Sequence, residues 1–331
     1  MHALTIAVLV DREIVIPGTA QLLGGRSERF AIGALKRLAR RVLIKPYAGA
    51  ADLARWIEET RPGLVFNMTE HADGDRRKDS HITAVLDAHR LPYTGPGPKG
   101  LMLCRDKAVS KIMAQRAGFA VPEFFVPDSS RLPASIRFPI VVKPRYGDAS
   151  EGIGQCSLVR DRSSLTERIA ALRRIGIDSI ICEEYVAGRE MLVSMVGRRI
   201  MPLRELVVGR DGPRIFSARL KHDASYRKRW SVRMAPAKLT REQERRIAAL
   251  ARRAAEELEL RDYGRLDVKL SPEGEWVFLE ANPNPALVPS KRSFSGAWPS
   301  EEYQSLIAQI TRSALRRAAY VPPRRARARR R

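Results

Sequence analysis

A stretch near the C-terminus places two carboxylates and an amide at spacings suited to a metal site. In GRLDVKLSPEGEWVFLEANPNP, residues 264–285, these side chains are Asp267, Glu280 and Asn282. Residues 271–274 (SPEG) have the Pro and Gly positions of a β-turn, and both flanks alternate with period two. We therefore expect an antiparallel hairpin, on which the three oxygen-bearing side chains share one face.

The expected register of this hairpin is symmetric about Pro272 and Glu273, which places Arg265 opposite Glu280 with Asp267 diagonal to it. The apolar face would then contain Leu266, Val268, Leu270, Val277, Leu279 and Ala281. Trp276 and Phe278 would share the polar face, which argues against a face that is simply solvated.

Two carboxylates and an amide oxygen are hard ligands, and they suit Mg²⁺ held partly by the protein and partly by substrate phosphates. Mn²⁺ is an alternative ion for the same ligands. For the hairpin alone, a polar face on which Glu280 merely pairs with Arg265 is the competing interpretation.

Two lysines and a glycine-containing loop could bind phosphate. Lys143 ends a predicted strand and precedes PRYGDASEGIG, whose backbone N–H groups could face phosphate oxygens and whose residues could close as a lid. Lys107 lies in the first turn of a predicted helix. The segment Glu183-Glu184-Tyr185-Val186 could offer backbone groups to an adenine edge, and Glu190 could contact ribose hydroxyls. Each feature alone is more often a surface lysine or an ordinary edge strand.

The composition indicates a folded, basic protein. The chain has 331 residues, 44% of them apolar, and a formal charge of +23. Removing the six arginines of the C-terminal PPRRARARRR leaves +17, so the remainder is basic too and would favour polyanions such as ATP. We expect the tail to be disordered and able to contact polyanions. The basic residues are otherwise interleaved with acids, which argues against a dedicated nucleic-acid function.

Three further features concern location. No apolar run reaches the length of a membrane span, and ALTIAVLV near the start lacks a basic leader and is interpreted as a strand. Cys104, Cys156 and Cys182 are scattered without metal-type spacing. Reduced thiols and a cytoplasmic location are expected.

The alternation of elements predicts an α/β protein. Strands are expected at 3–10 and 63–67, helices at 27–42 (with Ser27 as N-cap) and 81–89, and a strand running into a linker at 91–98. Further along, helices are expected at 107–117, 164–175, 241–259 and 301–317, and strands at 138–144, 154–159, 179–186, 191–196 and 205–208. Asp106 and the Thr240–Gln243 capping box would open two of these helices.

Four motifs in series resemble the ATP-grasp superfamily, most closely its D-alanine–D-alanine ligase branch. They are RDKAVSK (105–111), VVKPRYGDASEGIG (141–154), EEYVAGRE (183–190) and GRLDVKL…FLEANPNP (264–285). The resemblance covers residues from about 91 to 318. It implies three domains, which we place at 1–98 (parallel-sheet pre-ATP-grasp domain), 99–186 (central ATP-grasp subdomain with the lid) and 187–320 (C-terminal subdomain with the metal site), before the tail 321–331.

The resemblance also implies residue roles. Lys107 and Lys143 would hold the α- and β-phosphates of ATP, with Ser150 and Gly152 in the lid above them. Glu183, Glu184, Tyr185 and Val186 would form the strand that binds adenine, and Glu190 would bind ribose. Asp267, Glu280 and Asn282 would hold two Mg²⁺ ions, and Arg265 would stabilise the acyl-phosphate. Lys221 would reach the γ-phosphate, with Arg219 as a competitor.

The N-terminal third departs from the family pattern, so the substrates stay open. The residues GGRSER (24–29) resemble a family motif whose Glu orients the first amino acid, but they come late in the sequence and leave Glu28 a weak candidate. The candidates for contacts with the carboxylate substrate and the acceptor are Asn67, Glu70, His71, Ser290, Lys291 and Ser293.

The implied function is ATP-dependent ligation of two small amino-acid-like substrates through an acyl-phosphate. D-alanine–D-alanine ligation is the named default, and another amino-acid or peptide pair is the alternative. From a different class, a basic nucleic-acid- or membrane-associated protein could keep the ATP-binding fold without ligase activity. The family's common state allows a homodimer.

Overall fold

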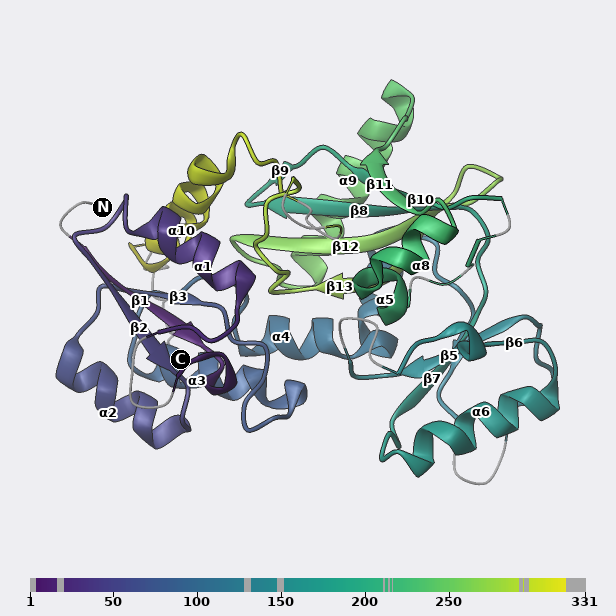
Figure 1. Cartoon of the computed structure of the whole chain (residues 1–331), viewed down its shortest axis with the longest axis horizontal. Coiled ribbons are helices and arrows are strands. Elements are labelled where there is room, and N and C mark those ends of the chain that lie inside the picture. The colour runs from purple at the N-terminus through teal and green to yellow at the C-terminus, as the bar shows by residue number, and fades with distance from the viewer. Residues whose placement is uncertain are drawn as a thin grey trace, which may run out of the picture.

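The residues that the structure describes form three β-sheets, which follow one another along the chain (Figure 1). The computed structural model describes residues 4–16, 21–127, 132–147, 152–210, 212–213, 215, 217–291, 294 and 298–319. Ser150, Ser293 and the tail 321–331 lie outside the described residues.

The first sheet is parallel and three-stranded, in the order β2-β1-β3. It consists of β1 (Thr5–Val10), β2 (Arg41–Pro46) and β3 (Leu64–Asn67), and the helices around it are α1 (Arg26–Leu35), α2 (Ala50–Thr60) and α3 (Asp79–Ala88). The last helix of the chain, α10 (Tyr303–Ala319), returns to pack against α1 in the same apolar core. The predicted β-α-β alternation with a parallel sheet is confirmed.

Two local predictions in this part were wrong. The helix expected through Val42 ends at Leu35, since the chain turns there and enters β2, and its N-cap is Gly25 rather than Ser27. The Ser27 hydroxyl instead accepts a hydrogen bond of 2.6 Å from the backbone N–H of Leu287. The strand expected at 91–98 is reduced to one bridge between Tyr93 and Val65. Pro98 then opens α4 (Pro98–Arg105), because proline suits the first turn of a helix.

The central sheet is antiparallel, in the order β4-β7-β5-β6. Its strands are β4 (Phe124–Phe125), β5 (Ile140–Pro144), β6 (Leu158–Val159) and β7 (Ile180–Glu184). Helix α6 (Arg162–Arg174), capped by Asp161, packs Leu165 and Ile169 against this sheet. The strand expected at 154–159 keeps only its last two residues, because residues Gln155–Ser157 form a 3₁₀ turn.

The third sheet carries the predicted metal hairpin at its edge, in the order β11-β10-β8-β12-β13, with β9 paired to β8. Its strands are β8 (Arg189–Val196), β9 (Arg199–Ile200), β10 (Arg204–Val207), β11 (Arg233–Pro236), β12 (Tyr263–Leu270) and β13 (Trp276–Asn282). Helix α9 (Arg241–Glu257), opened by the predicted capping box, and α5 (Lys107–Arg116), capped by Asp106, share one apolar core with this sheet. Two short helices, α7 (Ala218–His222) and α8 (Ala224–Arg229), lie between β10 and β11 in the chain.

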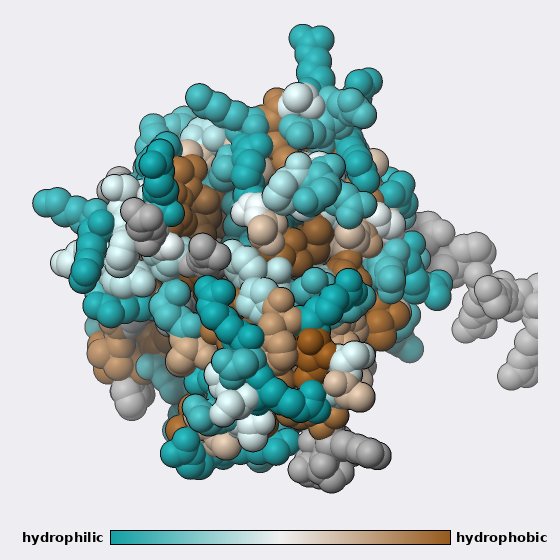
Figure 2. All heavy atoms as spheres, turned by 90° about the vertical axis from the view of Figure 1, so that its right-hand side faces the viewer, coloured by the Kyte–Doolittle hydropathy of each residue, from teal (hydrophilic) through white to brown (hydrophobic). Residues whose placement is uncertain are grey.

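Figure 2 views the molecule from the right-hand side of Figure 1, where the central sheet lies. This face is hydrophilic over much of its surface, and apolar side chains appear toward its middle. In the part of the chain that the structure describes, no helix is long and apolar enough to cross a membrane.

Candidate functional site

The hairpin forms as predicted, but with a different register. The Ser271 carbonyl accepts a hydrogen bond of 3.0 Å from Gly274, whose φ of +84° favours glycine. Arg265 lies opposite Asn282, and Asp267 lies directly opposite Glu280. A β-bulge follows, because Val268 pairs with Phe278 and leaves Leu279 as an extra residue in β13.

The observed register corrects the predicted faces. The pairing is already shifted by one residue at the turn, so Trp276 pairs with Leu270 and Phe278 with Val268, and both aromatic side chains point into the apolar core, at 1% and 0% exposure. The bulge then returns the alternation, so that Ala281 faces the same core. Leu279, expected in the core, lines a pocket beside Glu280 instead. A period-two pattern shows neither the shift at the turn nor the extra residue of the bulge, and together they move the partner of Arg265 from the predicted Glu280 to Asn282.

Asp267, Glu280 and Asn282 do come together on one face of the β12–β13 pair, at the edge of the sheet. Arg265 donates two hydrogen bonds to Asp267, of 2.6 and 3.0 Å. Burial, and then the nearby charge of Glu280, raise the pKa of the Asp267 carboxyl above its ordinary value. The Asn282 side chain is buried, and its Nδ2 has no hydrogen-bond partner among the described residues. Within the described ranges, no group of three or more His, Cys, Asp or Glu side chains could hold a metal ion, so any metal here would need amide or substrate oxygens as well.

The two predicted phosphate lysines approach this group from the central sheet and α5. Lys107 Nζ donates a hydrogen bond of 2.5 Å to the Gly147 carbonyl and lies 3.7 Å from Glu280 Oε2. Lys143 Nζ lies 2.9 Å from Glu183 Oε2. Both lysines are buried.

One pocket between the central and third sheets collects most of the predicted ATP residues. It is lined by Val141, Lys143, Ile153, Glu183, Glu184, Tyr185, Val186, Glu190, Ile215, Lys221, Asp267, Lys269, Leu279 and Glu280. A smaller cavity next to it is lined by Lys107, Gly147, Glu280 and Asn282 together with Cys104, Arg105 and Ala281. The structure therefore places the metal-type and phosphate-type residues in adjoining spaces.

The predicted adenine segment continues directly from β7. The backbone N–H groups of Glu184 and Tyr185 donate to the carbonyls of Glu123 and Pro139, at 2.8 and 2.9 Å. The Val186 carbonyl accepts a hydrogen bond of 2.7 Å from Lys269 Nζ, which also lies 4.8 Å from the centre of the Tyr185 ring. Lys269 had been placed on the correct face from period two, but no role was predicted for it.

The two candidates for the γ-phosphate contact, Lys221 and Arg219, both lie on α7 but have different surroundings. Lys221 lines the pocket, and its charge lowers the pKa of both Glu190 and Asp267, against the larger effect of their burial. The Arg219 side chain is 69% exposed and pairs with Asp223 at 3.3 Å.

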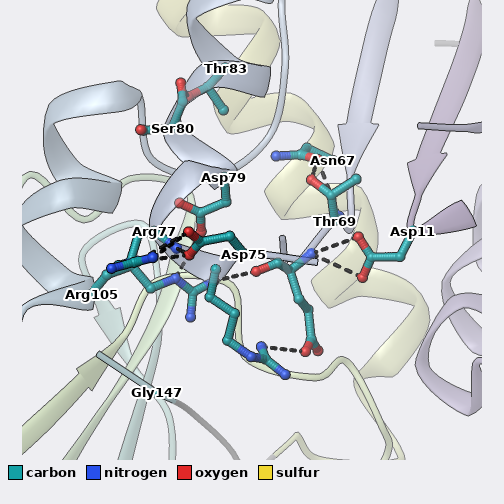
Figure 3. A network of polar contacts seen from close by, with 12 residues as sticks. Asp11, Asn67, Thr69, Asp75, Arg77, Asp79, Ser80, Thr83, Arg105 and Gly147 are labelled. Atoms are coloured by element: carbon teal, nitrogen blue, oxygen red, sulfur yellow. Dashed lines mark hydrogen bonds and ion pairs between the residues drawn. The ribbon is translucent and has the colours of Figure 1, made fainter. Parts of the chain in front are cut away.

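The loop after β3 forms a separate polar network (Figure 3). The Asn67 side-chain oxygen accepts hydrogen bonds from the Thr69 N–H and hydroxyl, at 3.2 and 2.7 Å. Both Asp11 oxygens accept from the Glu70 N–H at 3.2 Å, and Glu70 itself pairs with Arg76 at 2.7 Å.

Asp11 lies in a crowded acidic setting. His71 Nε2 is 3.8 Å from Asp11 and 3.6 Å from Glu13. Burial raises the pKa of Asp11 to about 6, although the His71 charge opposes that shift. Burial likewise raises the pKa of Glu28, and the charges of Glu70 and Asp11 add to this effect. Of the predicted substrate residues, Glu70 therefore lies close to Glu28 and Asp11.

His71 also lines a cavity of about 660 Å³ with residues of the central sheet, among them Tyr146 and Gly147. Gly147 borders the small cavity beside Lys107 too, so the two spaces adjoin. Arg105, which the sequence analysis did not single out, crosses this region: its Nε donates to Asp79 at 2.8 Å and its Nη2 to the Glu70 carbonyl at 3.4 Å.

Lys291 and Ser290 lie elsewhere. The Lys291 side chain is 73% exposed, pairs with Glu301 and lines a cavity with Arg37 and Tyr303, apart from the ATP-type residues. The Ser290 N–H donates to the Trp298 carbonyl at 2.7 Å.

Comparison with known proteins identifies the family. The model of the family described as D-ala D-ala ligase C-terminus matches residues 125–311. The chain belongs to the D-alanine–D-alanine ligase family. An uncharacterized protein of Sinorhizobium fredii, y4sG, is 30% identical over 264 residues, which are 77% of this ligase and 75% of that protein. The D-alanine–D-alanine ligase of Alcanivorax borkumensis is 28% identical over 318 residues, 93% and 97% of the two chains.

Solved structures agree in fold. The D-alanine–D-alanine ligase from Bacillus anthracis complexed with ATP matches with a TM-score of 0.70 at 18% identity, over 96% of this ligase and 99% of that chain. The VanG D-Ala:D-Ser ligase from Enterococcus faecalis matches with a TM-score of 0.69 at 18% identity, over 95% and 100%. The expected ATP-grasp fold is confirmed, and the family makes the chain an ATP-dependent carboxylate–amine ligase rather than a nucleic-acid- or membrane-associated binding protein.

Proposed function

We propose that this ligase joins two amino-acid-like substrates, with D-alanine–D-alanine ligation as the first candidate. The observation that carries the proposal is the single pocket in which Lys143, Lys221, Asp267 and Glu280 meet the segment Glu183–Val186. A pocket between two sheets that holds lysines together with facing carboxylates has the kinds of charged group that phosphoryl transfer requires. The named relatives support the choice of first candidate.

In the proposed reaction, a carboxylate oxygen of the first substrate attacks the γ-phosphorus and ADP leaves. The amine of the second substrate then attacks the acyl carbon, loses a proton, and expels phosphate. Phosphoryl transfer needs positioning and charge neutralisation more than covalent help from the protein.

The chain's own residues would supply that positioning. Lys107 and Lys143 hold the α- and β-phosphates, and Lys221 reaches the γ-phosphate, since Arg219 points to solvent. Arg265 stabilises the charge that develops on the acyl-phosphate.

The rest of the nucleotide would be held along β7 and under the lid. The backbone of the segment Glu183, Glu184, Tyr185, Val186 binds adenine, and Glu190 binds ribose. Ser150 and Gly152 belong to the lid; Gly152 has a φ of +65°, which a lid turn can use.

Asp267, Glu280 and Asn282 fit a pair of Mg²⁺ ions, or Mn²⁺ in their place. The fit rests on the donor chemistry and on the raised pKa of Asp267, because a cation would relieve the repulsion between two facing carboxylates. When bound, the ions would neutralise charge on the phosphates.

The proposed substrate residues come from the N-terminal network and from the segment after β13. His71 lines the cavity beside the N-terminal network, and Glu70 pairs with Arg76, which lines it too, whereas Asn67 is buried with its oxygen already bonded to Thr69. Ser290 and Lys291 would contact the acceptor only if it extends to their side of the molecule, and Ser293 lies outside the described residues.

We also propose the domain limits 1–98, 99–186 and 187–320, a cytoplasmic location and a homodimer. The three successive sheets and the three free cysteines support the first two of these.

The experiment that tests the function is phosphate release from Mg-ATP across a panel of D- and L-amino acids, supplied singly and in pairs. Release with D-alanine alone supports the first candidate, and release that requires another pair names that pair. Mg-ATP binding without release under any pair would contradict ligation of free amino acids.

A further inference from the structure

Lys111 is a buried lysine next to the ATP pocket for which the reaction described above has no role. It lies on α5, four residues after Lys107, and is 0% exposed. Its Nζ lies 2.7 Å from Glu183 Oε1 and donates a hydrogen bond of 2.7 Å to the Leu279 carbonyl. Lys111 thus connects α5 with the adenine strand β7 and with the bulge of the metal hairpin.

Glu183 is shared between two lysines. One carboxylate oxygen faces Lys111, and the other lies 2.9 Å from Lys143 Nζ. The Glu183 side chain is only 4% exposed, so its charge is compensated by these lysines rather than by water. Lys143 lines the ATP pocket and Lys111 does not, so only Lys143 can face a nucleotide.

Lys111, Glu183 and Lys143 form a charged triad, and its net charge determines how strongly the triad attracts phosphate to the pocket. Two ammonium groups and one carboxylate leave one net positive charge, next to the space that phosphates would occupy. Without Lys111, Glu183 and Lys143 would form a neutral one-to-one pair. A charge balanced by a buried partner attracts phosphate less, because the two fields largely cancel at the distance of the ligand.

The protonation states fit this count. Although burial opposes both charges, the two lysines hold the pKa of Glu183 below its usual range, and Glu183 raises the pKa of Lys143 above its usual range. Burial lowers the pKa of Lys111 to about 8, and Glu183 opposes that shift.

We propose that Lys111 is a positioning residue that neutralises Glu183 and so leaves the charge of Lys143 available to the nucleotide phosphates. The inference rests on the proposed function in one respect, namely that Lys143 holds ATP phosphates. It assigns Lys111 no contact with substrate.

A purely structural role makes a different prediction. Removing the Lys111 ammonium leaves the Leu279 carbonyl without its partner, and this loss is the same whether position 183 is Glu or Gln. The charge role instead predicts that neutralising Glu183 in the same molecule restores the pocket, since Lys143 then regains its uncompensated charge.

The test compares the unchanged protein with the variants Lys111→Met, Lys111→Met/Glu183→Gln, Lys111→Arg and Lys143→Met, with Mg-ATP affinity measured by titration calorimetry. Lys111→Met should weaken Mg-ATP binding about 10- to 100-fold, as for the loss of one charged phosphate contact. The double variant should recover most of that loss. Lys111→Arg keeps the charge and should retain most of the Mg-ATP affinity of the unchanged protein, which tests the proposal even if Lys111→Met fails to fold. Lys99→Met is the matched control, because Lys99 is a 72% exposed lysine on the neighbouring helix.

A double variant that binds Mg-ATP as weakly as Lys111→Met would overturn the proposal, as would a Lys111→Met that binds it as tightly as the unchanged protein. These outcomes are separate from a failure of the proposed function. If the unchanged protein does not bind Mg-ATP, or if Lys143→Met binds it equally well, the assignment of the pocket itself is wrong.

Discussion

Asp267 and Glu280 face each other directly across the β12–β13 pair, at the last position before the bulge. Carboxylates at cross-strand distance repel each other. Arg265 bonds both oxygens of Asp267, and Lys107 Nζ lies 3.7 Å from Glu280 Oε2. The cations that we propose for this site would relieve the repulsion that remains.

The first prediction concerns Glu280. Glu280→Gln should lower the rate of phosphate release about 100- to 1,000-fold, because it removes a charge that would act on the metal and phosphates. Glu273→Gln, in the exposed turn of the same hairpin, is the control and should keep full activity. Equal activity of the two variants in a steady-state assay would contradict the metal assignment.

The corrected register makes its own prediction. Phe278→Ala should lower the free energy of unfolding by about 3–5 kcal/mol, because Phe278 is a fully buried core residue. Leu279→Ala should cost far less stability and should instead weaken Mg-ATP binding, since Leu279 lines the pocket. Urea unfolding and ATP titration of both variants check this, and the reverse pattern would restore the symmetric register.

Lys221 and Arg219 can be separated by kinetics. Lys221→Met should reduce kcat for phosphate release by about 100-fold, as for the loss of a group that acts on the transferring phosphoryl. Arg219→Met should leave kcat and the KM for ATP nearly unchanged, because its guanidinium is largely in solvent. A large effect of Arg219→Met with none of Lys221→Met would exchange the two roles.

Asp11 should give the protein a measurable pH dependence of stability. Burial raises its pKa in the folded state to about 6, so between about pH 4 and pH 6 the folded protein binds more protons at this group than the unfolded chain does. The contribution of Asp11 to the free energy of unfolding is therefore largest below about pH 4. It falls as the pH rises through about 6, by at most about 3 kcal/mol in total.

Asp11→Asn removes this titration. The difference in unfolding free energy between the variant and the unchanged protein should grow in the variant's favour from pH 4.5 to pH 7, as measured by urea unfolding. A difference that stays constant with pH would show that Asp11 has the same pKa in both states.

The sequence predicted the elements whose signals are local. The Thr240 capping box, the Asp106 N-cap and the turn at Gly274 are short-range patterns, and the structure has each of them. The site residues that converge in the pocket come from four motifs far apart in the chain, and the family resemblance rather than periodicity brought them together.

Two of the misses, the bulge and the role of Lys111, depend on contacts between residues that are distant in sequence. The bulge at Leu279 is set by pairing with β12 and by core packing, neither of which an alternation pattern contains. Lys111 has a local signal, four residues after Lys107 on one helix face, but its partners Glu183 and Leu279 are distant in sequence. Strand β2 went unnoticed because a helical pattern was extended through the turn that precedes it.

Activation of the carboxylate by the γ-phosphate of ATP is tested most directly by following oxygen from the substrate carboxylate into the released phosphate. The first amino acid is supplied with ¹⁸O in its carboxyl group, together with Mg-ATP and the amine that supports turnover, and the released phosphate is analysed by mass spectrometry. Activation by γ-phosphoryl transfer should give ADP and a phosphate that carries one ¹⁸O per turnover, because the carboxylate oxygen that attacks the γ-phosphorus leaves with it. Unlabelled phosphate, or label recovered in AMP, would contradict activation of the carboxylate by γ-phosphoryl transfer.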